Sequence, residues 1–561
     1  MAFSSSSFIS YKKEHLGYFV FPSSFPCSFI TNMKCKKTIS KNIVSLVSPV
    51  KNKRNPSATG SSKTPMTTTE KILARASEKP EVKPGENAWV NVDVLMINDI
   101  TCPGVSGIFK REFGSTAKVW DPEKIIVIPD HYIFTNDERA HRNVDTAREF
   151  CMEQDIKYFY DIQDRSNFRA NSDYKGVCHV ALAQEGHCRP GEVLLGTDSH
   201  TTSAGAFGQF ATGVGNTDAA FILGTGKILL KVPPTMRFVI DGEMPNYLLA
   251  KDLILNIIGE ISMSGATYKT MEFVGTTIET LTMEERMTLC NMVVEAGGKN
   301  GIVAADRTTY KYLEDKTSTP YEPVFSDEKA RQVQFLPQFS YISNYNCFFH
   351  PFGINEGYIE KSPINIKSFG GDLMFRSLNG LGHLSSVAPN IPTVTIFDRS
   401  EIPHSPDNRA LARECNNVKI DRVYIGSCTG GKTGDFMAAA KVSLAAGKTV
   451  KVPTFLVPAT QKVWMDIYTL EVPGSGGKTC SKIFEDAGCD PPASPSCAAC
   501  MGGPKDTYGR INEPKVCVST TNRNFPGRMG HKEGQVYLAS PYTAAASALT
   551  GFVTDPRNFL Q

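Results

Sequence analysis

Three cysteines towards the end of the chain have the residue type and spacing of a metal site. Cys428 lies in the glycine-rich stretch 424–431, and Cys497 and Cys500 form a CxxC pair further along. Structural zinc sites take four ligands, whereas three thiolates on a four-iron cluster leave one iron open to substrate. An open iron would act as a Lewis acid. A CxxC pair on its own is more often a redox pair, half of a zinc site or a coincidence.

Asp130 and His131 could form an acid–base pair. They follow the apolar run 125–128, which predicts a strand, and ligands of open α/β sheets bind where strands end. A carboxylate beside an imidazole fixes its tautomer and raises its basicity, as a group that protonates a leaving hydroxyl requires. A single histidine at such a place is more often structural. His141 and His187 are expected on the surface.

Two further pairs have useful spacing. Asn291 and Glu295 are four residues apart, so on a helix they would share one face and could point together at the cluster. The alternative is a solvated face of an amphipathic helix. Arg523 and Arg528 flank Gly527 in a predicted loop, and guanidinium groups bind carboxylates through two parallel hydrogen bonds. A dicarboxylate substrate would need such donors.

The elements that must position these residues alternate along the chain. Short β-rich runs bounded by Pro, Gly or Asp alternate with helical stretches, which predicts an α/β fold with mostly parallel sheets. Strands are expected at residues 90–95, 124–128, 193–195, 237–240 and 423–425, and helices at residues 137–154, 218–227, 247–258 and 283–296. Cys428 then lies in a loop after a strand, where small neighbours would let a bulky cluster approach. Cys489 and Cys517 are alternative ligands without that glycine-rich setting.

Composition and charge describe a globular body behind a basic leader. With 561 residues the chain exceeds one hydrophobic core, so two to four domains are expected. The net charge is +3, but residues 1–69 carry ten Lys or Arg and one acid, which leaves −6 for the body. Nucleic-acid binding by that body is disfavoured. The serine-rich leader predicts an organellar transit peptide, with a disordered basic tail as the alternative.

Cysteine usage and hydropathy bear on the compartment of the protein and on whether it spans a membrane. The 15 cysteines lack the regular spacing of a disulfide framework, which indicates a reducing compartment. No apolar run approaches the roughly 18 residues that a membrane helix needs. Residues 336–401 have no sustained period, and long structureless loops are uncommon inside compact domains. We interpret this stretch as a retained intron or gene-model error, or else as a lineage-specific insertion.

Five separated motifs connect the chain to a known family. They are residues 196–201 (GTDSHT), 290–295 (CNMVVE), 424–431 (YIGSCTGG), 495–503 (PSCAACMGG) and 521–528 (TNRNFPGR). With these motifs the chain resembles the aconitase and isopropylmalate isomerase family of hydro-lyases, from about residue 70 to 335 and from about 402 onward. The resemblance implies three aconitase-like α/β domains, at 67–235, 236–335 and 402–561, without the mobile swivel domain of the larger members. Residues 1–66 would be the transit peptide.

The resemblance also implies an active site. Cys428, Cys497 and Cys500 would hold a 4Fe–4S cluster, and Asp130 with His131 would protonate the leaving hydroxyl. The other implied catalytic residues are His179, Asp198, His200 and Glu295, and the implied substrate-binding residues are Ser199, Asn291, Asn522, Arg523 and Arg528. Near residues 102–104 the chain lacks a glutamine that bacterial relatives place against substrate, so the pocket wall is expected to differ.

The activity implied by the resemblance is the interconversion of 2-isopropylmalate and 3-isopropylmalate through isopropylmaleate, in leucine biosynthesis. The alternatives are methylthioalkylmalate isomerisation in methionine chain elongation, and an apo form that binds RNA as an iron sensor. The family's proton-abstracting serine belongs to the swivel domain, so a separate isopropylmalate isomerase small subunit is the expected partner. The substrate would be a small hydroxy dicarboxylate, with no membrane partner and nucleic acid disfavoured. The leader predicts the chloroplast stroma.

Overall fold

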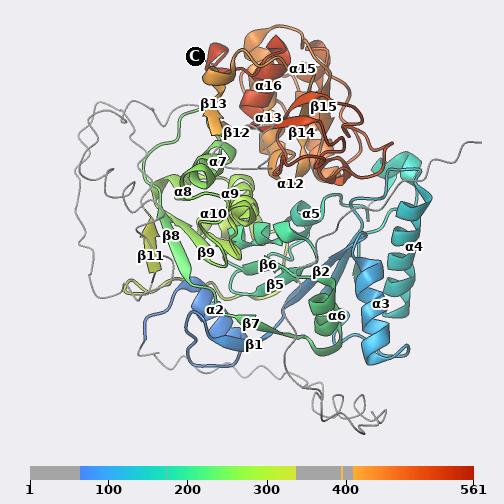
Figure 1. Cartoon of the computed structure of the whole chain (residues 1–561), viewed down its shortest axis with the longest axis vertical. Helices are drawn as coiled ribbons and strands as arrows, with labels where there is room; N and C mark the ends of the chain where they lie inside the picture. Colours follow the sequence, from blue (N-terminus) through green and yellow to red (C-terminus); the bar gives the residue numbers. More distant parts are fainter. Residues whose placement is uncertain (1–63, 172, 331, 336–392, 396–408, 561) are drawn as a thin grey trace, which may run out of the picture. The chain divides into compact units, whose positions relative to one another are not determined.

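The computed structural model describes residues 64–171, 173–330, 332–335, 393–395 and 409–560 (Figure 1). The predictions made for the leader up to residue 63, and for most of the stretch 336–401, lie outside the described residues. The predicted boundaries of the three domains remain predictions, and the sheets are described below one by one.

A five-stranded, wholly parallel sheet carries the first group of site residues. Its order is β4 (Tyr158–Phe159), β3 (Ile125–Ile128), β2 (Val94–Asn98), β5 (Val193–Gly196) and β6 (Phe210–Gly213). Its helices are α3 (Cys102–Phe113), α4 (Glu138–Glu153), α5 (Cys178–Gln184), α6 (Asn216–Thr225) and the 3₁₀ helices η1 (Arg165–Ala170) and η2 (Ser199–Phe207). Every residue of β2, β3 and β5 is buried, as expected when helices cover both faces of a parallel sheet. Figure 1 shows α3 and α6 side by side next to this sheet.

The predicted strand at 90–95 is wrong, because two strands share that run. β1 (Asn87–Asn91) pairs antiparallel with β7 (Lys227–Lys231) in a separate two-stranded sheet, and β2 begins only at Val94. The cause is Asp93, whose carboxylate accepts a hydrogen bond from Val193 N at 2.9 Å and turns the chain between the two strands.

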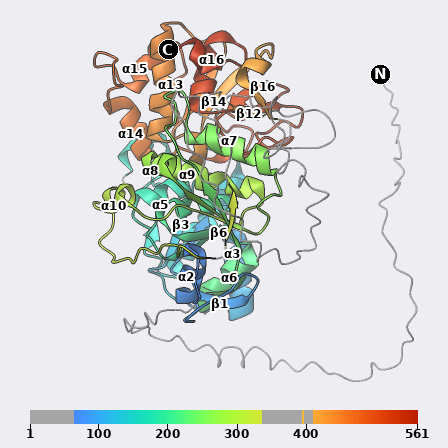
Figure 2. The ribbon, with the colours of Figure 1, turned by 90° about the vertical axis from the view of Figure 1, so that its left-hand side faces the viewer.

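A four-stranded, wholly parallel sheet carries the second group. Its order is β10 (Asn300–Ile302), β9 (Thr270–Val274), β8 (Thr235–Val239) and β11 (Gln332–Phe335). The helices around it in sequence are α2 (Thr68–Ala76), α7 (Ala250–Ile261), α8 (Thr276–Thr280), α9 (Met283–Asn291), the 3₁₀ helix η3 (Met292–Ala296) and α10 (Arg307–Leu313). Figure 1 and the turned view in Figure 2 both show α8 and α9 next to each other. Thr282 begins α9 with a capping box, in which its side chain and that of Glu285 satisfy each other's backbone N–H.

A six-stranded mixed sheet carries the cysteines. Its order is β13 (Arg409–Leu411), β12 (Thr393–Thr395), β17 (Gln535–Leu538), β16 (Val516–Ser519), β14 (Arg422–Gly426) and β15 (Thr454–Val457). Its helices are α12 (Ser427–Gly430), α13 (Thr433–Ala446), α14 (Gln461–Thr469), α15 (Cys480–Asp486), α16 (Pro541–Thr550) and the 3₁₀ helices η5 (Ala412–Cys415), η6 (Ala498–Met501) and η7 (Pro556–Asn558). β12 pairs antiparallel with β13 and β17, and the other pairs are parallel. β12 lies within the stretch 336–401 that the sequence sets apart.

The prediction of an α/β fold with mostly parallel sheets is confirmed. The predicted helices at 137–154, 218–227 and 247–258 correspond to α4, α6 and α7, each within about three residues at its ends. One continuous hydrophobic cluster contains residues of all three larger sheets, including Met96, Phe238 and Tyr424, together with the three cysteines of the predicted metal site. None of the helices in the described ranges has the length and apolar character needed to cross a bilayer.

Candidate active site

Cys428, Cys497 and Cys500 lie together in the protein interior. Cys428 lies not in a loop, as predicted, but in the short helix α12 that directly follows β14, and Cys497 and Cys500 lie at the two ends of a single turn around η6. Cys497 Sγ is 3.0 Å from Cys500 Sγ. All three are free thiols that are at most 6% exposed. Because Cys497 N donates to the Asp130 carbonyl at 3.1 Å, the CxxC pair is tied to the end of β3.

Hydrogen bonds among the three thiols shift their pKa values in opposite directions. A hydrogen bond with Cys497 is the largest cause that lowers the pKa values of Cys428 and Cys500, and the same bonds raise the pKa of Cys497. Burial raises the pKa of Cys489 to about 12 and that of Cys517 to about 11. Because metals bind thiolates rather than thiols, Cys428 and Cys500 are better prepared as ligands than these two alternatives.

The glycines around Cys428 serve contacts within the protein. A Cβ on Gly430 would lie 2.2 Å from Thr520 Cβ, and a Cβ on Gly426 would lie 2.7 Å from the Val457 carbonyl oxygen. Thr520 Oγ1 also donates to the Gly426 carbonyl at 3.0 Å. The expectation that these glycines leave room for a cluster is therefore wrong for Gly426 and Gly430. These two glycines instead let the backbone around Cys428 pack against β15 and against Thr520, the residue after β16.

Two buried amides point at the Cys428 sulfur. Asn291 Nδ2 donates to Cys428 Sγ at 3.1 Å and to Ser203 Oγ at 2.8 Å. Asn522 Nδ2 lies 3.6 Å from the same sulfur and 3.4 Å from Asn291 Oδ1. Hydrogen bonds from neutral donors stabilise a thiolate and orient it. The two amides therefore favour the deprotonated form of Cys428.

Asp130 and His131 form a buried ion pair at the end of β3. His131 Nδ1 lies 2.6 Å from Asp130 Oδ1, and Asp130 Oδ2 accepts from Cys178 N at 2.8 Å. Asp99, which the sequence analysis missed, lies 3.5 Å from His131 Nδ1 and accepts from Tyr132 N at 2.7 Å. Asp99 directly follows β2, and the rule applied to Asp130 after β3 would have found it.

The two carboxylates decide the protonation state of His131. Burial lowers the pKa of His131, but the charges and hydrogen bonds of Asp130 and Asp99 outweigh it and raise that pKa well above its usual value. The imidazolium is thus the stable form at neutral pH. Its Nδ1–H is held by the carboxylates, which leaves the proton on Nε2 as the one that can be transferred.

A second polar network links four of the other predicted residues. His179 Nε2 lies 2.9 Å from Asp198 Oδ1, which also accepts from His200 N at 2.8 Å. His200 Nε2 lies 2.8 Å from Glu295 Oε1. Burial lowers the pKa of His200, but hydrogen bonds to Asp198 and Glu295 outweigh it and raise that pKa to about 9. The pKa of Asp198 is well below its usual value because its hydrogen bonds with His179 and His200 outweigh burial.

Asn291 and Glu295 do not point together at the cysteines, which corrects the prediction from their spacing. The predicted single helix over 283–296 is α9 followed by η3, so the helical repeat changes between the two residues. Asn291 contacts Cys428, whereas Glu295 binds His200 and accepts from Arg523 Nε at 2.8 Å. Arg523 Nη2 also donates to Ser199 Oγ at 3.2 Å. Glu295 therefore belongs to the histidine network.

The two predicted arginines are used differently. Arg523 is committed to Glu295 and Ser199. Arg528 is half-buried, its Nε has no hydrogen-bond partner among the described residues, and its charge lowers the pKa of Cys500. Of the two, Arg528 is the guanidinium with a free donor next to the thiols.

Two buried lysines were also missed. Lys432 Nζ donates to Thr288 Oγ1 at 2.9 Å and to the Thr429 carbonyl at 3.0 Å, and lies 2.8 Å from Asp435. Lys251 Nζ donates to the Thr521 carbonyl at 2.6 Å. Each lysine side chain thus holds the backbone next to a site residue, Cys428 or Asn522. Because lysine is rarely buried, no sequence pattern distinguished these two from surface lysines.

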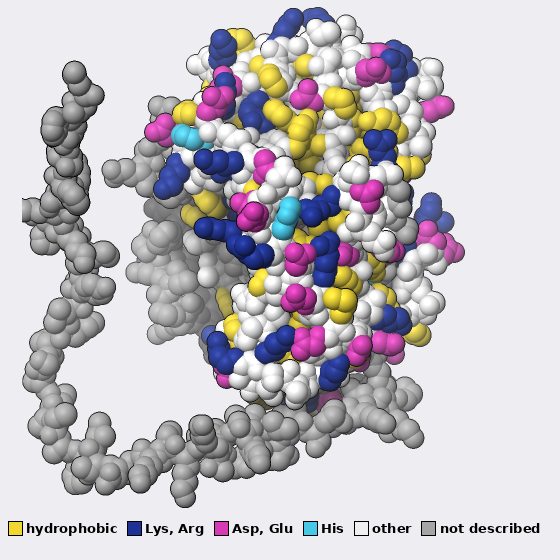
Figure 3. Space-filling view, turned by 90° about the vertical axis from the view of Figure 1, so that its right-hand side faces the viewer, with side chains coloured by type: hydrophobic (Ala, Val, Ile, Leu, Met, Phe, Trp, Pro, Cys, Tyr) yellow, Lys and Arg dark blue, Asp and Glu magenta, His cyan; other side chains and the backbone are white. Residues whose placement is uncertain are grey.

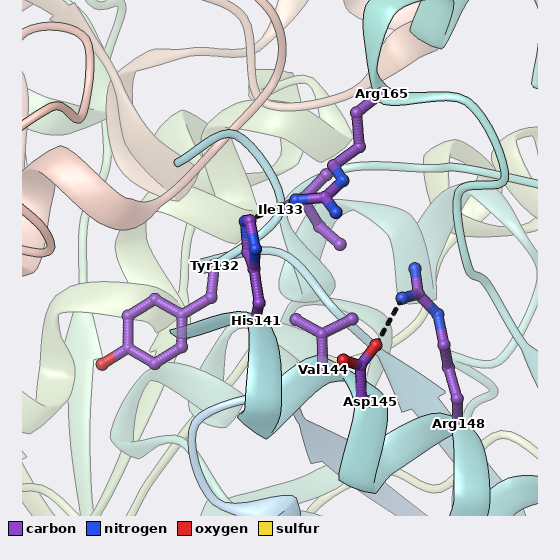
Figure 4. Close-up of a pocket in the computed structure, with 7 residues that line it drawn as sticks. All are labelled: Tyr132, Ile133, His141, Val144, Asp145, Arg148 and Arg165. Atoms are coloured by element: carbon purple, nitrogen blue, oxygen red, sulfur yellow. Dashed lines mark hydrogen bonds and ion pairs between the residues drawn. The ribbon is translucent and has the colours of Figure 1, made fainter. Parts of the chain in front are cut away.

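The two histidines expected on the surface are both more enclosed than predicted. His187 is 5% exposed and its Nε2 lies 2.7 Å from Tyr160 Oη. His141 is half-buried and lines a small hollow with Tyr132, Ile133, Val144, Asp145, Arg148 and Arg165 (Figure 4). That hollow has a volume of about 10 Å³, which a water molecule fills, so it is not the substrate site.

Comparison with known proteins gives consistent matches. The model of the aconitase family (aconitate hydratase) matches residues 70–347 and 390–551. A chloroplastic 3-isopropylmalate dehydratase large subunit of Arabidopsis thaliana is 67% identical over 561 residues, covering 100% of this chain and 99% of the relative. 3-isopropylmalate dehydratase large subunit 1 of Methanopyrus kandleri is 36% identical over 497 residues (88% and 99%). The large subunit of Heliobacterium modesticaldum is 34% identical over 492 residues (88% and 99%).

Proposed function

The chain belongs to the aconitase family, and from that membership we propose that it is the large subunit of a 3-isopropylmalate dehydratase. This hydro-lyase interconverts 2-isopropylmalate and 3-isopropylmalate by removing water and adding it back at the neighbouring carbon. The observation that carries the proposal is the meeting of three buried thiols, an imidazolium held by two carboxylates and a half-buried arginine in one interior.

The three thiols fit the 4Fe–4S cluster that members of this family generally bind. The residues that would hold it are Cys428, Cys497 and Cys500, which are free and buried, and hydrogen bonds with Cys497 lower the pKa values of Cys428 and Cys500. The amides of Asn291 and Asn522 already donate towards the Cys428 sulfur. Three thiolates leave one iron without a protein ligand, and that iron would supply Lewis-acid chemistry to the substrate hydroxyl and carboxylate.

His131 is the acid that we assign to the leaving hydroxyl. Its Nε2 proton passes to that hydroxyl, which leaves as water, and the Asp130 and Asp99 carboxylates stabilise the imidazolium before transfer. In rehydration the neutral Nε2 takes the proton back from water while the oxygen adds to the double bond. The proton on the neighbouring carbon is taken by a base that we assign to the partner.

The remaining polar residues orient the substrate. Arg528 offers the unpaired guanidinium nitrogen that a substrate carboxylate requires. His179, Asp198, His200 and Glu295 form a continuous hydrogen-bonded run, which Arg523 and Ser199 extend. A run of this kind holds each imidazole in one orientation, because every shared proton has a fixed partner. We assign to it the positioning of the substrate hydroxyl.

The partner and the location follow from the relatives. These relatives are named as large subunits, and that of Arabidopsis thaliana is named as chloroplastic. We propose that a small subunit with the swivel domain completes the site and supplies the carbon base. We further propose that the chain acts in the chloroplast stroma.

An RNA-binding iron sensor is less well supported. On the face in Figure 3 the Lys and Arg side chains lie among Asp and Glu side chains instead of forming one basic patch. Phosphate backbones are bound by basic patches, so this face does not favour nucleic acid. Methylthioalkylmalate remains the alternative substrate, because it presents the same hydroxy dicarboxylate to these residues.

Competition between the two substrates tests the assignment. The chain would be expressed without residues 1–66, loaded anaerobically with iron and sulfide, and mixed with a plant small subunit. We expect kcat/KM for 2-isopropylmalate to exceed that for a methylthioalkylmalate by at least about 10-fold, which corresponds to about 1.4 kcal/mol of discrimination. The reverse ratio would move the assignment to methionine chain elongation.

A further inference from the structure

Tyr424 has a buried hydroxyl without a partner next to the proposed cluster site. Its side chain is fully buried in the middle of β14, and its Oη makes no hydrogen bond with any described residue. Tyrosine hydroxyls that are buried usually find a partner, because an unsatisfied polar group in a low-dielectric interior costs free energy. Such an orphaned donor requires an explanation.

Two glycines fix the position of the Tyr424 ring. A Cβ on Gly509 would lie 2.7 Å from Tyr424 Cε2, and a Cβ on Gly426 would lie 2.9 Å from Cε1. The ring is therefore held on both sides next to its hydroxyl end. Gly426 is the last residue of β14 and directly precedes α12, which contains Cys428. The ring thus lies beside the end of the strand from which Cys428 is presented.

The CxxC segment lies on the same face of the sheet. Tyr424 belongs to the hydrophobic cluster that contains Cys428, Cys497 and Cys500, whereas its strand neighbours Val423 and Ile425 belong to the cluster on the other face. Arg422, two residues earlier, donates to the Gly509 carbonyl at 2.8 Å and so holds the following segment over this face.

The electrostatic surroundings keep the Tyr424 hydroxyl protonated. Burial, followed by the charges of Cys500 and Cys497, raises the pKa of Tyr424 well above its usual value. The hydroxyl therefore keeps its proton at neutral pH and can donate a hydrogen bond. The thiols of Cys497 and Cys500, whose charges act on this hydroxyl, belong to the same buried cluster as the Tyr424 ring. A sulfur that accepts a hydrogen bond becomes less electron-rich.

We infer that the Tyr424 hydroxyl donates a hydrogen bond to a sulfur of the bound iron–sulfur cluster and makes the cluster harder to oxidise. The inference rests on the proposed cofactor. Tyr424 would contact the cluster and not the substrate, so its role is to tune the cluster and not to take part in the reaction. Its expected effect is protection of the iron that has no protein ligand, because oxidation of such a cluster releases that iron.

Tyr424→Phe tests the inference, since it removes one oxygen and keeps the ring. The chain without residues 1–66 is loaded anaerobically with iron and sulfide, and ferricyanide is added as the one-electron oxidant. Electron paramagnetic resonance counts the three-iron product over time. We expect the variant to lose its fourth iron about 10-fold faster than the unsubstituted chain, as is typical when an outer hydrogen bond to a metal ligand is removed.

Tyr537→Phe is the matched control. Tyr537 is a buried tyrosine of the same sheet, on β17, and belongs to the cluster on the opposite face. Its substitution should leave the rate of iron loss within about 2-fold of the unsubstituted rate. In addition, electron–nuclear double resonance after exchange into D₂O should show in the control one exchangeable proton coupled to the reduced cluster beyond those of the Asn291 and Asn522 amides, and this additional coupling should be absent in Tyr424→Phe.

The outcomes separate the inference from the proposed function. If the unsubstituted chain takes up no four-iron cluster, the proposed cofactor fails and the inference fails with it. If the chain is loaded but Tyr424→Phe oxidises at the same rate with the same exchangeable coupling, only the inference is overturned. Thermal unfolding of the apoproteins gives a second check, because a hydroxyl without a partner adds no stability. An apo Tyr424→Phe chain that is less stable than the unsubstituted one would also overturn the inference.

Discussion

Asp130→Asn isolates the protonation state of His131 from its position. Asp130 Oδ2 accepts from Cys178 N at 2.8 Å, and Oδ1 lies 2.6 Å from His131 Nδ1. In the variant the amide oxygen keeps the bond from Cys178 N, so the amide nitrogen faces His131 Nδ1. Two donors cannot share one hydrogen bond. Of the two carboxylates that raise the pKa of His131, only the more distant Asp99 remains, 3.5 Å from Nδ1. We therefore expect His131 to accept at Nδ1 and to carry its only proton on Nε2 as a neutral ring.

The magnitude follows from this change of state. A neutral imidazole is a far weaker acid than an imidazolium, so proton donation to the leaving hydroxyl is lost while the side chain keeps its place. General acid catalysis contributes about 10²- to 10⁴-fold. We therefore expect kcat to fall about 10³-fold, which is about 4 kcal/mol of transition-state stabilisation. KM should change by less than about 3-fold, because substrate carboxylates are assigned to Arg528.

The assay compares kcat per loaded cluster in the reconstituted complex, with iron content measured for each sample. Asp137→Asn is the matched control: Asp137 is exposed and caps α4 by accepting hydrogen bonds from Arg139 N and Ala140 N. Asparagine caps helices about as well as aspartate, so this variant should keep full activity. An Asp130→Asn enzyme that is loaded with cluster and retains more than about a third of the wild-type kcat would refute the role of His131 as the acid.

Four other perturbations test separate parts of the account. Lys432→Met leaves Asp435 buried without its ion-pair partner and should lower the free energy of unfolding in urea by about 3–5 kcal/mol. The double variant with Asp435→Asn should recover at least about 1 kcal/mol of that loss. A double variant that recovers none of it would show that the two residues do not stabilise each other. Burial, and then a nearby arginine, lowers the pKa of His187 from 6.5 to about 3, so the unfolded chain binds a proton there that the folded chain does not. The free energy of unfolding should therefore fall as pH decreases below 6.5, by about 2 kcal/mol at pH 5 from this residue alone, and His187→Gln should remove that part of the loss. Arg528→Lys should raise KM about 10-fold with a smaller effect on kcat, because a single ammonium replaces a bidentate donor; an unchanged KM would exclude the carboxylate role. Cys428→Ser should abolish the four-iron absorption spectrum, whereas the same spectrum in the variant would mean that another residue is the ligand.

The sequence could predict those parts of the site that depend on residue type and local position. Cys428 and the CxxC pair stand out by spacing, and Asp130 with His131 stands out because it follows a β-rich run. The change from α9 to η3 could not be predicted, because Asn291 and Glu295 have the spacing of one continuous helix. The partners of each side chain come from contacts between segments that are far apart in the sequence, as with Arg523 and Glu295.

The buried lysines and His187 show more clearly what could not be predicted from the sequence. Lys432 and Lys251 look like surface residues, and His187 was placed on the surface for the same reason. Their burial is set by the packing of distant segments around them, since Lys432 binds Thr288 and Lys251 binds the carbonyl of Thr521. Hydrophobic periodicity cannot predict such contacts, because it counts every lysine as polar wherever the residue lies in the fold.

The turnover of 2-isopropylmalate by the chain without residues 1–66, after anaerobic loading and with and without a plant small subunit, tests the proposed function most directly. We expect a four-iron spectrum in both samples and formation of 3-isopropylmalate only when the small subunit is present. A complex that carries the cluster and binds the small subunit, yet turns over no 2-isopropylmalate, would contradict it.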